Sequence, residues 1–444
     1  MSTIMYDHLN TDRALGTPLE NHFPVIIVGG GQAGLSMSHC LKERAIDHII
    51  FEKQRLAESW RSKRWDTFCL VTPNWQCKLP GFDYPGDDPH GFMKKDEIVE
   101  YVEAYARSFK PPLKEGVTVL RLCRHDSGVF EVNTSIGDYF ADHVVIATGA
   151  YHVPNIPRFA ERFPASITQL DSSKYKNPAS LPPGDILVVG SGQSGCQIAE
   201  DLHLAGRRVH LCVGGAPRTA RRYRGKDVVA WLHEMSYYNK PVHEHPLKER
   251  VRAKANHYVT GRDGGRDIDL RKFAIEGMRL YGRLREVREN LLNFGDDLKH
   301  NLDQADAVSE SIKTTIDKFI EAKQIDAPIE ERYRPVWEPE THCLELDYSE
   351  ANISTVIWCM GYRTDYSWIE IPVFDGKGYP THERGVTNVP GVYFLGLPWL
   401  YTWGSGRFSG VAQDTIFLAN YIEARHGAAR TDGERLLNEL ALGS

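Results

Sequence analysis

The amino-acid sequence predicts an α/β fold with two parallel sheets, because one unit occurs twice along the chain. Residues 23–28 (FPVIIV) are a short apolar run that leads into the glycine turn GGGQAG at 29–34, a helical pattern and a second apolar run at 48–51. Residues 186–189 (ILVV) lead in the same way into GSGQSG at 190–195, a helical pattern and the run VHLCV at 209–213. Strand, glycine turn, helix and strand within about 30 residues is typical of a Rossmann-like dinucleotide-binding unit.

The composition is that of a folded protein and narrows its class. The chain has 444 residues, of which 41% are hydrophobic and 25% charged, and its formal net charge is -6. The length suits two or three domains at roughly 100–200 residues each. The absence of a basic excess argues against sequence-independent nucleic-acid binding. No apolar run approaches the ~18 residues of a membrane span, and no secretory signal pattern opens the chain, so we expect no membrane association.

The cysteines predict a reducing compartment and no metal site. Eight cysteines are scattered along the chain, and no two of them form a C-x-x-C pair. Zinc sites and dithiol redox motifs commonly have such spacing. Reduced, mostly buried thiols are therefore expected, in a cytoplasmic protein.

The first glycine turn predicts a site for a dinucleotide that stays bound. In such a turn the first glycine (Gly29) permits the bend, the second (Gly31) lets the backbone approach a pyrophosphate, and the third (Gly34) allows close packing of helix on strand. The phosphates then lie at the helix N-terminus, where free N–H groups favour negative charge. Glu52 stands 18 residues after Gly34 and is placed to accept hydrogen bonds from a ribose.

The second glycine turn predicts a different nucleotide. The position equivalent to Glu52 is Val213, and no acidic residue occurs from Val209 to Arg224. Arginines cluster there instead: Arg218, Arg221, Arg222 and Arg224. Guanidinium groups can bind a 2′-phosphate, so this cluster favours NADPH over NADH. The alternative is a solvated basic face or a set of interdomain salt bridges.

Two dinucleotide units on one chain suggest FAD in the first and NADPH in the second. We expect the second unit to be inserted in the first, with helical decoration from the charged stretch 226–330. The expected divisions are an N-terminal arm (1–22), the first part of the FAD-binding domain (23–180), the NADPH-binding domain with its helical insertion (181–340), and the second part of the FAD-binding domain with a C-terminal helix (341–444).

Several segments together resemble the two-dinucleotide-binding-domain flavoproteins of the flavin-containing monooxygenase type. They are 25–34 (VIIVGGGQAG), Trp60-Arg61, 144–149 (VVIATG), 190–195, 358–363 (WCMGYR) and 391–396 (GVYFLG). The similarity is greatest to bacterial relatives of the plant auxin-forming flavin monooxygenases, and extends to the flavin oxidoreductases found beside nitrilase genes. It spans about residues 23–425 and implies an FAD-dependent enzyme that consumes NADPH.

The sequence also departs from that family. The monooxygenase fingerprint has a glycine two residues after a phenylalanine and a histidine four further on. Here Phe163 is followed by Ala165, two residues are extra, and Asp171 stands where the histidine would be. The family's asparagine directly after a threonine is shifted, because Pro73 separates Thr72 from Asn74. Oxygen insertion is therefore less firmly implied than flavin binding.

From the motifs and the resemblance we expect two sets of site residues. Asn74 and Gln76 are the catalytic candidates, as hydrogen-bond donors near flavin N5; the alternative is a polar loop packing on its own turn. Trp60 could equally be a core residue. The expected cofactor-binding residues are Gly29, Gly31, Gln32, Ala33, Gly34, Glu52, Lys53, Trp60, Arg61, Thr148, Gly149, Gly190, Gly192, Gln193, Ser194, Gly195, Arg218, Arg221, Arg222, Gly361, Tyr362 and Gly396.

For three further features, the sequence allows either a ligand-binding role or a structural role. Asp171, which precedes Ser172 and Ser173, could border the nicotinamide pocket, although a helix cap is favoured. The glycine-rich charged loop 256–267 could contact a ligand, although a structural turn is favoured. The aromatic and glycine-rich segment 398–410 is expected to line the flavin and substrate cavity.

The sequence thus predicts a monooxygenase that acts on a small organic substrate with molecular oxygen, through a flavin C4a-(hydro)peroxide. One alternative is an NADPH-dependent flavin oxidoreductase without oxygen insertion. Another is a flavin electron-transfer protein that docks a protein partner on its charged 226–330 region. Homo-oligomerisation stays open, and a disulfide reductase is disfavoured by the lack of a C-x-x-C pair.

Overall fold

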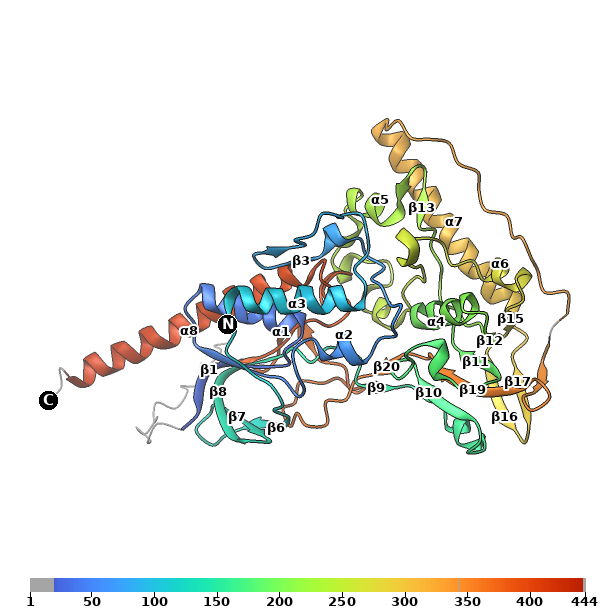
Figure 1. The fold of residues 1–444 in the computed structure, drawn as a ribbon. Helices are drawn as coiled ribbons and strands as arrows, with labels where there is room; N and C mark the ends of the chain where they lie inside the picture. The colour runs from blue at the N-terminus through green and yellow to red at the C-terminus, as the bar shows by residue number, and fades with distance from the viewer. Residues whose placement is uncertain (1–19, 342, 442–444) are drawn as a thin grey trace, which may run out of the picture.

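The computed structural model describes residues 20–341 and 343–441 and contains two large β-sheets with the helices that cover them (Figure 1). The first sheet has the order β21-β22-β23-β8-β1-β2-β5, and β6 and β7 extend it from β8. Its strands are β1 (His22–Val28), β2 (His48–Phe51), β5 (Leu113–Lys114), β6 (Val119–Arg124), β7 (Phe130–Thr134), β8 (Gly137–Ile146), β21 (His382–Glu383), β22 (Val386–Thr387) and β23 (Val392–Phe394).

The centre of the first sheet is parallel, as the apolar strand patterns predict. The strands β5, β2, β1, β8 and β23 run parallel to their neighbours, with Ile27 opposite Ile50 and Val145. Both faces are buried: Val25 and Ile27 contribute to one apolar core, and Ile26 to another. The helices of this part are α1 (Gln32–Glu43), α2 (Glu58–Ser62), α3 (Lys95–Phe109) and α8 (Val411–Ala441). Residues of α1, α3 and α8 share the first of these cores.

The second sheet has the order β10-β19-β11-β12-β15, and all of its pairings are parallel. Its strands are β10 (Thr168–Asp171), β11 (Asp185–Val189), β12 (Val209–Cys212), β15 (Arg279–Tyr281) and β19 (Ile353–Trp358). The helix α4 (Gln193–Leu204) follows β11 directly. Both glycine turns therefore join a central parallel strand to a helix, as expected.

The observed sheet membership differs from the expected division of the chain. Strand β10 precedes residue 181 and β19 follows residue 340, yet both belong to the second sheet. The strand β19 (ISTVIW) is mostly apolar, whereas β10 (TQLD) is mostly polar. Neither sequence distinguishes one sheet from the other, because the pairing partners decide sheet membership. The chain passes between the sheets near β9 (Val153–Pro154) and β20 (Tyr362–Arg363), which pair with each other.

The stretch 226–330 contains more strands than its helical periodicity suggests. The helices α5 (Val228–Glu234), α6 (Leu270–Ile275) and α7 (Leu298–Lys323) are accompanied by β15 and by two small antiparallel sheets. The strands of the small sheets within this stretch are β14 (Lys226–Asp227), β16 (Leu284–Arg288) and β17 (Leu291–Phe294). Their partners β13 (Arg222–Tyr223) and β18 (Glu345–Asp347) lie just outside it. A last short pair, β3 (Lys78–Leu79) and β4 (Phe82–Asp83), lies in the first part of the chain.

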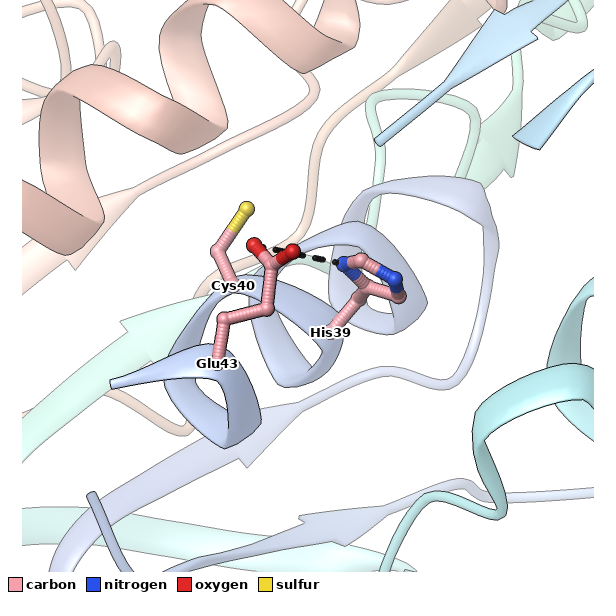
Figure 2. A group of neighbouring side chains, drawn as sticks. All are labelled: His39, Cys40 and Glu43. Atoms are coloured by element: carbon pink, nitrogen blue, oxygen red, sulfur yellow. Dashed lines mark ion pairs between the residues drawn. The ribbon is translucent and has the colours of Figure 1, made fainter. Parts of the chain in front are cut away.

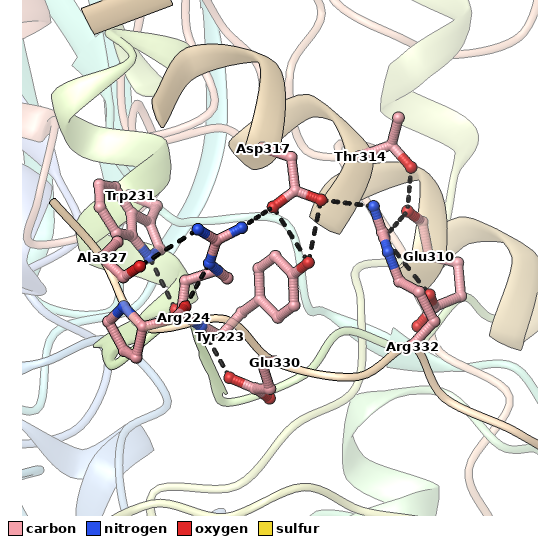
Figure 3. A network of polar contacts seen from close by, with 10 residues as sticks. Tyr223, Arg224, Trp231, Glu310, Thr314, Asp317, Ala327, Glu330 and Arg332 are labelled. Carbon is pink, nitrogen blue, oxygen red and sulfur yellow. Dashed lines mark hydrogen bonds and ion pairs between the residues drawn. The ribbon is translucent and has the colours of Figure 1, made fainter. Parts of the chain in front are cut away.

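Many of the charges in this stretch pair with one another. Figure 3 shows Asp317 of α7 accepting hydrogen bonds from the Tyr223 hydroxyl (2.9 Å), from Arg224 (2.9 Å) and from Arg332 (2.5 Å). Arg224 also donates to the carbonyl of Ala327 at 3.2 Å. The network attaches the chain after α7 to the helix itself. These charges thus have a structural role, which weakens the case for a charged docking face.

Candidate functional site

The first glycine turn has the geometry that a bound pyrophosphate requires. Gly29 has φ +108°, and a Cβ there would lie 2.7 Å from the Ala147 carbonyl oxygen. A Cβ at Gly34 would lie 1.9 Å from the carbonyl oxygen of Gly29, so the helix begins in close contact with the turn. By contrast, a Cβ at Gly31 would meet no described atom within 4 Å. The helix α1 starts next to this open position without a side-chain cap, leaving N–H groups for an anion.

Glu52 lies at the end of β2 and against the same turn. Its carboxylate accepts hydrogen bonds from the backbone N–H of Gly30 (2.7 Å) and of Gln54 (3.0 Å). These contacts fix the orientation of the carboxylate while each oxygen keeps further acceptor capacity. The position is consistent with the expected ribose contact. Lys53 beside it is exposed.

Several other expected flavin contacts converge on this turn. A Cβ at Gly396, after β23, would lie 2.6 Å from the Ala33 side chain. Thr148 and Gly149 follow β8, and the Thr148 Cα lies 3.2 Å from the Cβ position of Gly29. The Gln32 side chain donates to the carbonyl of Gly406 at 3.2 Å. The carboxyl ends of β1, β8 and β23 thus surround one site, as in open α/β sheets that bind ligands at that edge.

Trp60 and Arg61 have partners of their own. The Trp60 ring stacks on buried Phe408 with 5.7 Å between ring centroids. Arg61 forms an ion pair with Glu103 of α3. These contacts favour the packing alternative for Trp60 and a structural role for Arg61.

The two catalytic candidates differ in their surroundings. Asn74 and Gln76 lie in a short 3-10 turn (Asn74–Gln76), and both side chains are buried. The Asn74 amide donates to the Asp88 carbonyl (3.0 Å), and its oxygen accepts from the Met93 N–H (2.8 Å). Asn74 thus stabilises its own loop. The buried side-chain oxygen of Gln76 has no hydrogen-bond partner among the described residues, which keeps Gln76 as the candidate that could face a ligand.

The second glycine turn repeats the geometry of the first. Gly190 has φ +105°, and a Cβ at Gly195 would lie 1.8 Å from the Gly190 carbonyl oxygen. A Cβ at Gly192 would meet no described atom within 4 Å. The helix α4 begins at Gln193, whose side chain donates to the Val259 carbonyl at 2.6 Å, and Ser194 follows in its first turn. A second open helix N-terminus is thus available to phosphates.

The crossover residues Gly361 and Tyr362 lie beside this second turn. A Cβ at Gly190 would lie 2.6 Å from the carbonyl oxygen of Cys359, so the segment after β19 contacts the turn. Gly361 has φ +78°, and the Tyr362 hydroxyl is 3.0 Å from the Ser172 hydroxyl. The two crossover strands β9 and β20 therefore lie between the two candidate nucleotide sites.

Two of the three arginines expected to bind a 2′-phosphate are engaged elsewhere. Arg218 is buried and pairs with Asp306 at 2.7 Å. Arg221 is 2% exposed, pairs with Asp227 at 2.6 Å and donates to the Val71 carbonyl at 2.7 Å. Only Arg222 of the three is exposed. The structure thus supports the salt-bridge alternative for Arg218 and Arg221, because a buried guanidinium is unfavourable without a carboxylate partner.

The arginine that does lie at the edge of this site comes from a different strand. Arg283 follows β15, and a Cβ at Gly215 would lie 2.8 Å from its Nη2 atom. Sequence reasoning missed it, since Arg283 is far from the glycine turn along the chain. The sequence held only an indirect signal: Gly214 and Gly215 stand near the position where an acidic residue would contact the ribose.

The aromatic segment 398–410 forms a wall near the first turn. Arg407 stacks over the Trp403 ring at 3.8 Å and donates to Asn256 at 2.8 Å. Burial lowers the pKa of Arg407, and it lowers the pKa of Arg64, which lies 5.0 Å from the Trp60 ring. Neither guanidinium has a carboxylate partner among the ion pairs of the described residues. This positive charge suits a site for anionic nucleotides.

The other two open features have structural roles. Asp171 ends β10 and accepts from the backbone N–H of Ser173 at 2.9 Å, so it caps a turn and not the expected helix, because no helix begins there. In the loop 256–267, Arg262 pairs with Asp201 at 2.8 Å and Arg266 with Glu200 at 3.0 Å. These contacts hold the loop on α4.

His39, Cys40 and Glu43 gather on α1, as Figure 2 shows, with 3.7 Å between the His39 ring and the Glu43 carboxylate. Burial raises the pKa of the Cys40 thiol to about 11, which keeps it protonated at neutral pH. The His39 ring stacks on Tyr105. A metal would need the thiolate, so these residues suit helix packing better than coordination.

Glu200 gives the stability of the protein a specific pH dependence. It is 2% exposed in α4, beside a cavity of about 10 Å³, and burial raises its pKa from 4.5 to about 7. The proton is held more tightly in the folded state, so this contribution is complete below pH 4.5 and is lost as the pH rises through about 7. We expect the wild type to lose on the order of 2 kcal/mol relative to Glu200→Gln over that range.

Urea unfolding of both proteins between pH 4.5 and 8 measures that difference. Glu249→Gln, at an exposed position, is the control and should follow the wild type at every pH. A constant gap between the wild type and Glu200→Gln would contradict the raised pKa.

The two open glycine turns, at the carboxyl edges of two parallel sheets joined by paired crossover strands, define a flavoprotein oxidoreductase with two dinucleotide sites. Residues 26–268 match the family model described as pyridine nucleotide-disulphide oxidoreductase. The chain belongs to this family, and is an enzyme that uses FAD and NAD(P)H.

Relatives and solved structures agree with this assignment. The chain is 33% identical over 402 residues to an uncharacterized CzcO-like oxidoreductase of Geobacillus kaustophilus, covering 90% of this chain and 97% of that one. It is 33% identical over 207 residues to the indole-3-pyruvate monooxygenase YUCCA6 of Arabidopsis thaliana, covering 43% and 48%. A flavin monooxygenase structure from Stenotrophomonas maltophilia superposes with a TM-score of 0.63 at 18% identity, covering 91% and 99%.

These comparisons confirm the predicted fold class and the resemblance to flavin monooxygenases. Among the helices of the described residues, none combines the length and apolarity needed to cross a bilayer.

Proposed function

We propose that the protein is an NADPH-consuming, FAD-dependent monooxygenase of a small organic substrate. The observation that supports this most directly is the pair of open glycine turns, each at a helix N-terminus with space for a pyrophosphate. The similarity to an indole-3-pyruvate monooxygenase in sequence and to a flavin monooxygenase in fold supports the same proposal.

The residues at both turns fit the nucleotides they would hold. Gly31 and the N–H groups of α1 would face the FAD pyrophosphate, and Glu52 its ribose. Gly192 and the start of α4 would hold the nicotinamide nucleotide. FAD supplies the redox chemistry when bound, and the protein supplies binding and orientation.

The substrate side of the flavin site would be formed by the segment 398–410 and by Gln76. Trp399 packs with Val242 and Val251 in a small apolar cluster, and Trp403 lies against it. The Tyr238 ring approaches Trp403 at 4.4 Å. Such aromatic walls exclude water from a reacting centre, which limits wasteful side reactions. Gln76 would orient a flavin or substrate atom by hydrogen bonding.

Oxygen insertion is tested by following where the oxygen goes. The purified protein is supplied with NADPH, ¹⁸O₂ and candidate nitrogen, sulfur and carbonyl compounds, and hydrogen peroxide is measured in parallel. A monooxygenase gives a product containing one ¹⁸O atom for each NADPH consumed. If every compound that stimulates NADPH oxidation yields hydrogen peroxide and no labelled product, the proposed monooxygenase activity is rejected.

The second candidate function is an NADPH-dependent flavin oxidoreductase without oxygen insertion. It is favoured by Ala165 and Asp171, which replace the glycine and histidine of the monooxygenase fingerprint. Disulfide reduction is not the form we propose, despite the family description. The chain has no C-x-x-C pair, and burial raises the pKa of Cys196 and Cys359 beside the second turn.

A further inference from the structure

Arg283 lies where the adenosine ribose of a nicotinamide nucleotide would meet the second sheet. The parallel strands β12 and β15 are neighbours, and their carboxyl ends lie at the edge that carries the second glycine turn. The pairing continues one residue further, since the Val213 N–H donates to the Tyr281 carbonyl at 2.8 Å. Gly214 and Gly215 then follow β12, and Arg283 follows β15. Ribose hydroxyls bind at the end of the strand after the glycine-turn helix in such folds.

The guanidinium of Arg283 lies beside these two glycines. A Cβ at Gly215 would be 2.8 Å from Nη2 of Arg283, and a Cβ at Gly214 would be 3.9 Å from Nε. A larger side chain at Gly215 would displace the guanidinium, so the glycine pair leaves it room. Both glycines also lack the carboxylate that would repel a phosphate. Among the described residues, the side chain that lies within 4 Å of these two Cβ positions is that of Arg283.

The position of Arg283 is fixed by a carboxylate that does not neutralise the site. Asp297 accepts from the Arg283 backbone N–H at 2.9 Å and from its Nη1 at 2.6 Å. Arg285 also approaches Asp297, at 3.3 Å, so two guanidiniums share one carboxylate. The Arg283 side chain is 45% exposed, which leaves donors free for a ligand. A guanidinium held in this way can bind a phosphate through two parallel hydrogen bonds.

The alternatives within the predicted arginine cluster are weaker. Arg218 and Arg221 are buried in ion pairs, so a phosphate could reach them only if those pairs broke. Arg224 pairs with Asp317 at 2.9 Å. Arg222 is exposed and is the remaining rival in this cluster.

We propose that Arg283 binds the 2′-phosphate of NADPH, and that Gly214 and Gly215 make room for it, so that this residue pair and Arg283 set the preference over NADH. The proposal rests on the NADPH use proposed above and names the residue responsible for it.

The test measures binding of 2′,5′-ADP and 5′-AMP to the FAD-loaded protein by isothermal titration calorimetry. The two probes differ only in the 2′-phosphate, and the readout does not depend on turnover. In Arg283→Ala we expect 2′,5′-ADP to bind about 10- to 100-fold more weakly and 5′-AMP to bind unchanged, because a charge-assisted bidentate contact is lost. Arg283→Lys should retain part of the difference. Arg222→Ala, which tests the rival arginine, should retain all of it.

A complementary variant tests the role of the glycines. Gly214→Asp places a carboxylate next to Arg283 with only a 3.9 Å contact to accommodate. We expect this variant to bind 2′,5′-ADP more weakly and to have a lower KM for NADH relative to that for NADPH. A retained flavin absorbance spectrum shows that each variant is folded.

The outcomes separate this proposal from the proposed function. A wild type that binds 2′,5′-ADP no more tightly than 5′-AMP removes the NADPH preference and, with it, this proposal. The second case is a wild type that binds 2′,5′-ADP more tightly than 5′-AMP. If Arg283→Ala keeps this preference, or if only Arg222→Ala loses it, Arg283 does not bind the 2′-phosphate, and the proposed use of NADPH still stands.

Discussion

Gly31→Ala is expected to give a folded protein that no longer retains FAD. A Cβ at Gly31 would meet no described atom within 4 Å, so the methyl group costs the apoprotein little. The same methyl group occupies the place where the backbone must approach the pyrophosphate. We expect FAD affinity to fall by about 10- to 100-fold, corresponding to the cost of forcing a methyl group into an occupied space.

Absorbance near 450 nm after gel filtration and FAD titration of the apoprotein measure this effect, and thermal unfolding of the apoprotein is the internal control. Gly34→Ala is the matched contrast. Its Cβ would lie 1.9 Å from the Gly29 carbonyl oxygen, so this variant should destabilise the fold itself by at least about 3 kcal/mol. Normal FAD retention by Gly31→Ala would mean that the pyrophosphate lies elsewhere.

The glycine turns were predictable because local chemistry dictates them. Few structures other than a dinucleotide-binding turn are compatible with a buried parallel strand followed by glycines at positions 1, 3 and 6 of the turn. Gly29 and Gly190, at position 1, adopt the positive φ that the motif requires. The position of Glu52 beside this turn was predictable for the same reason, since it follows the next strand of the same unit, and its contact with a ribose stays a prediction. For these residues the sequence carries both the local structure and its spatial partner.

The rest of the site depends on which distant residues meet, and the sequence does not encode that locally. Arg218 and Arg221 belong to a cluster of basic residues in the sequence, yet in the folded protein they form ion pairs with Asp306 and Asp227. Arg283 reaches Gly215 only because β15 pairs with β12. Both polar atoms of the Asn74 side chain are hydrogen-bonded to backbone groups, and nothing in its sequence context separates it from Gln76.

Gly192→Ala is expected to separate the two nucleotide sites functionally. The Cβ position at Gly192 is open, as at Gly31, but it belongs to the turn before α4 in the second sheet. The variant should therefore retain FAD and its absorbance spectrum, while KM for NADPH rises about 10- to 100-fold because the methyl group occupies the space of the nucleotide pyrophosphate.

Reduction of the bound flavin distinguishes this effect from general damage. Dithionite does not use the nucleotide site, so it should bleach Gly192→Ala as completely as the wild type. NADPH at a concentration that reduces the wild type within seconds should leave most of the variant oxidised. Equal loss of reduction by dithionite and by NADPH would place the damage in the flavin site. Unchanged reduction by NADPH would mean that the second turn does not bind the nucleotide, and the assignment of one cofactor to each sheet would then be wrong.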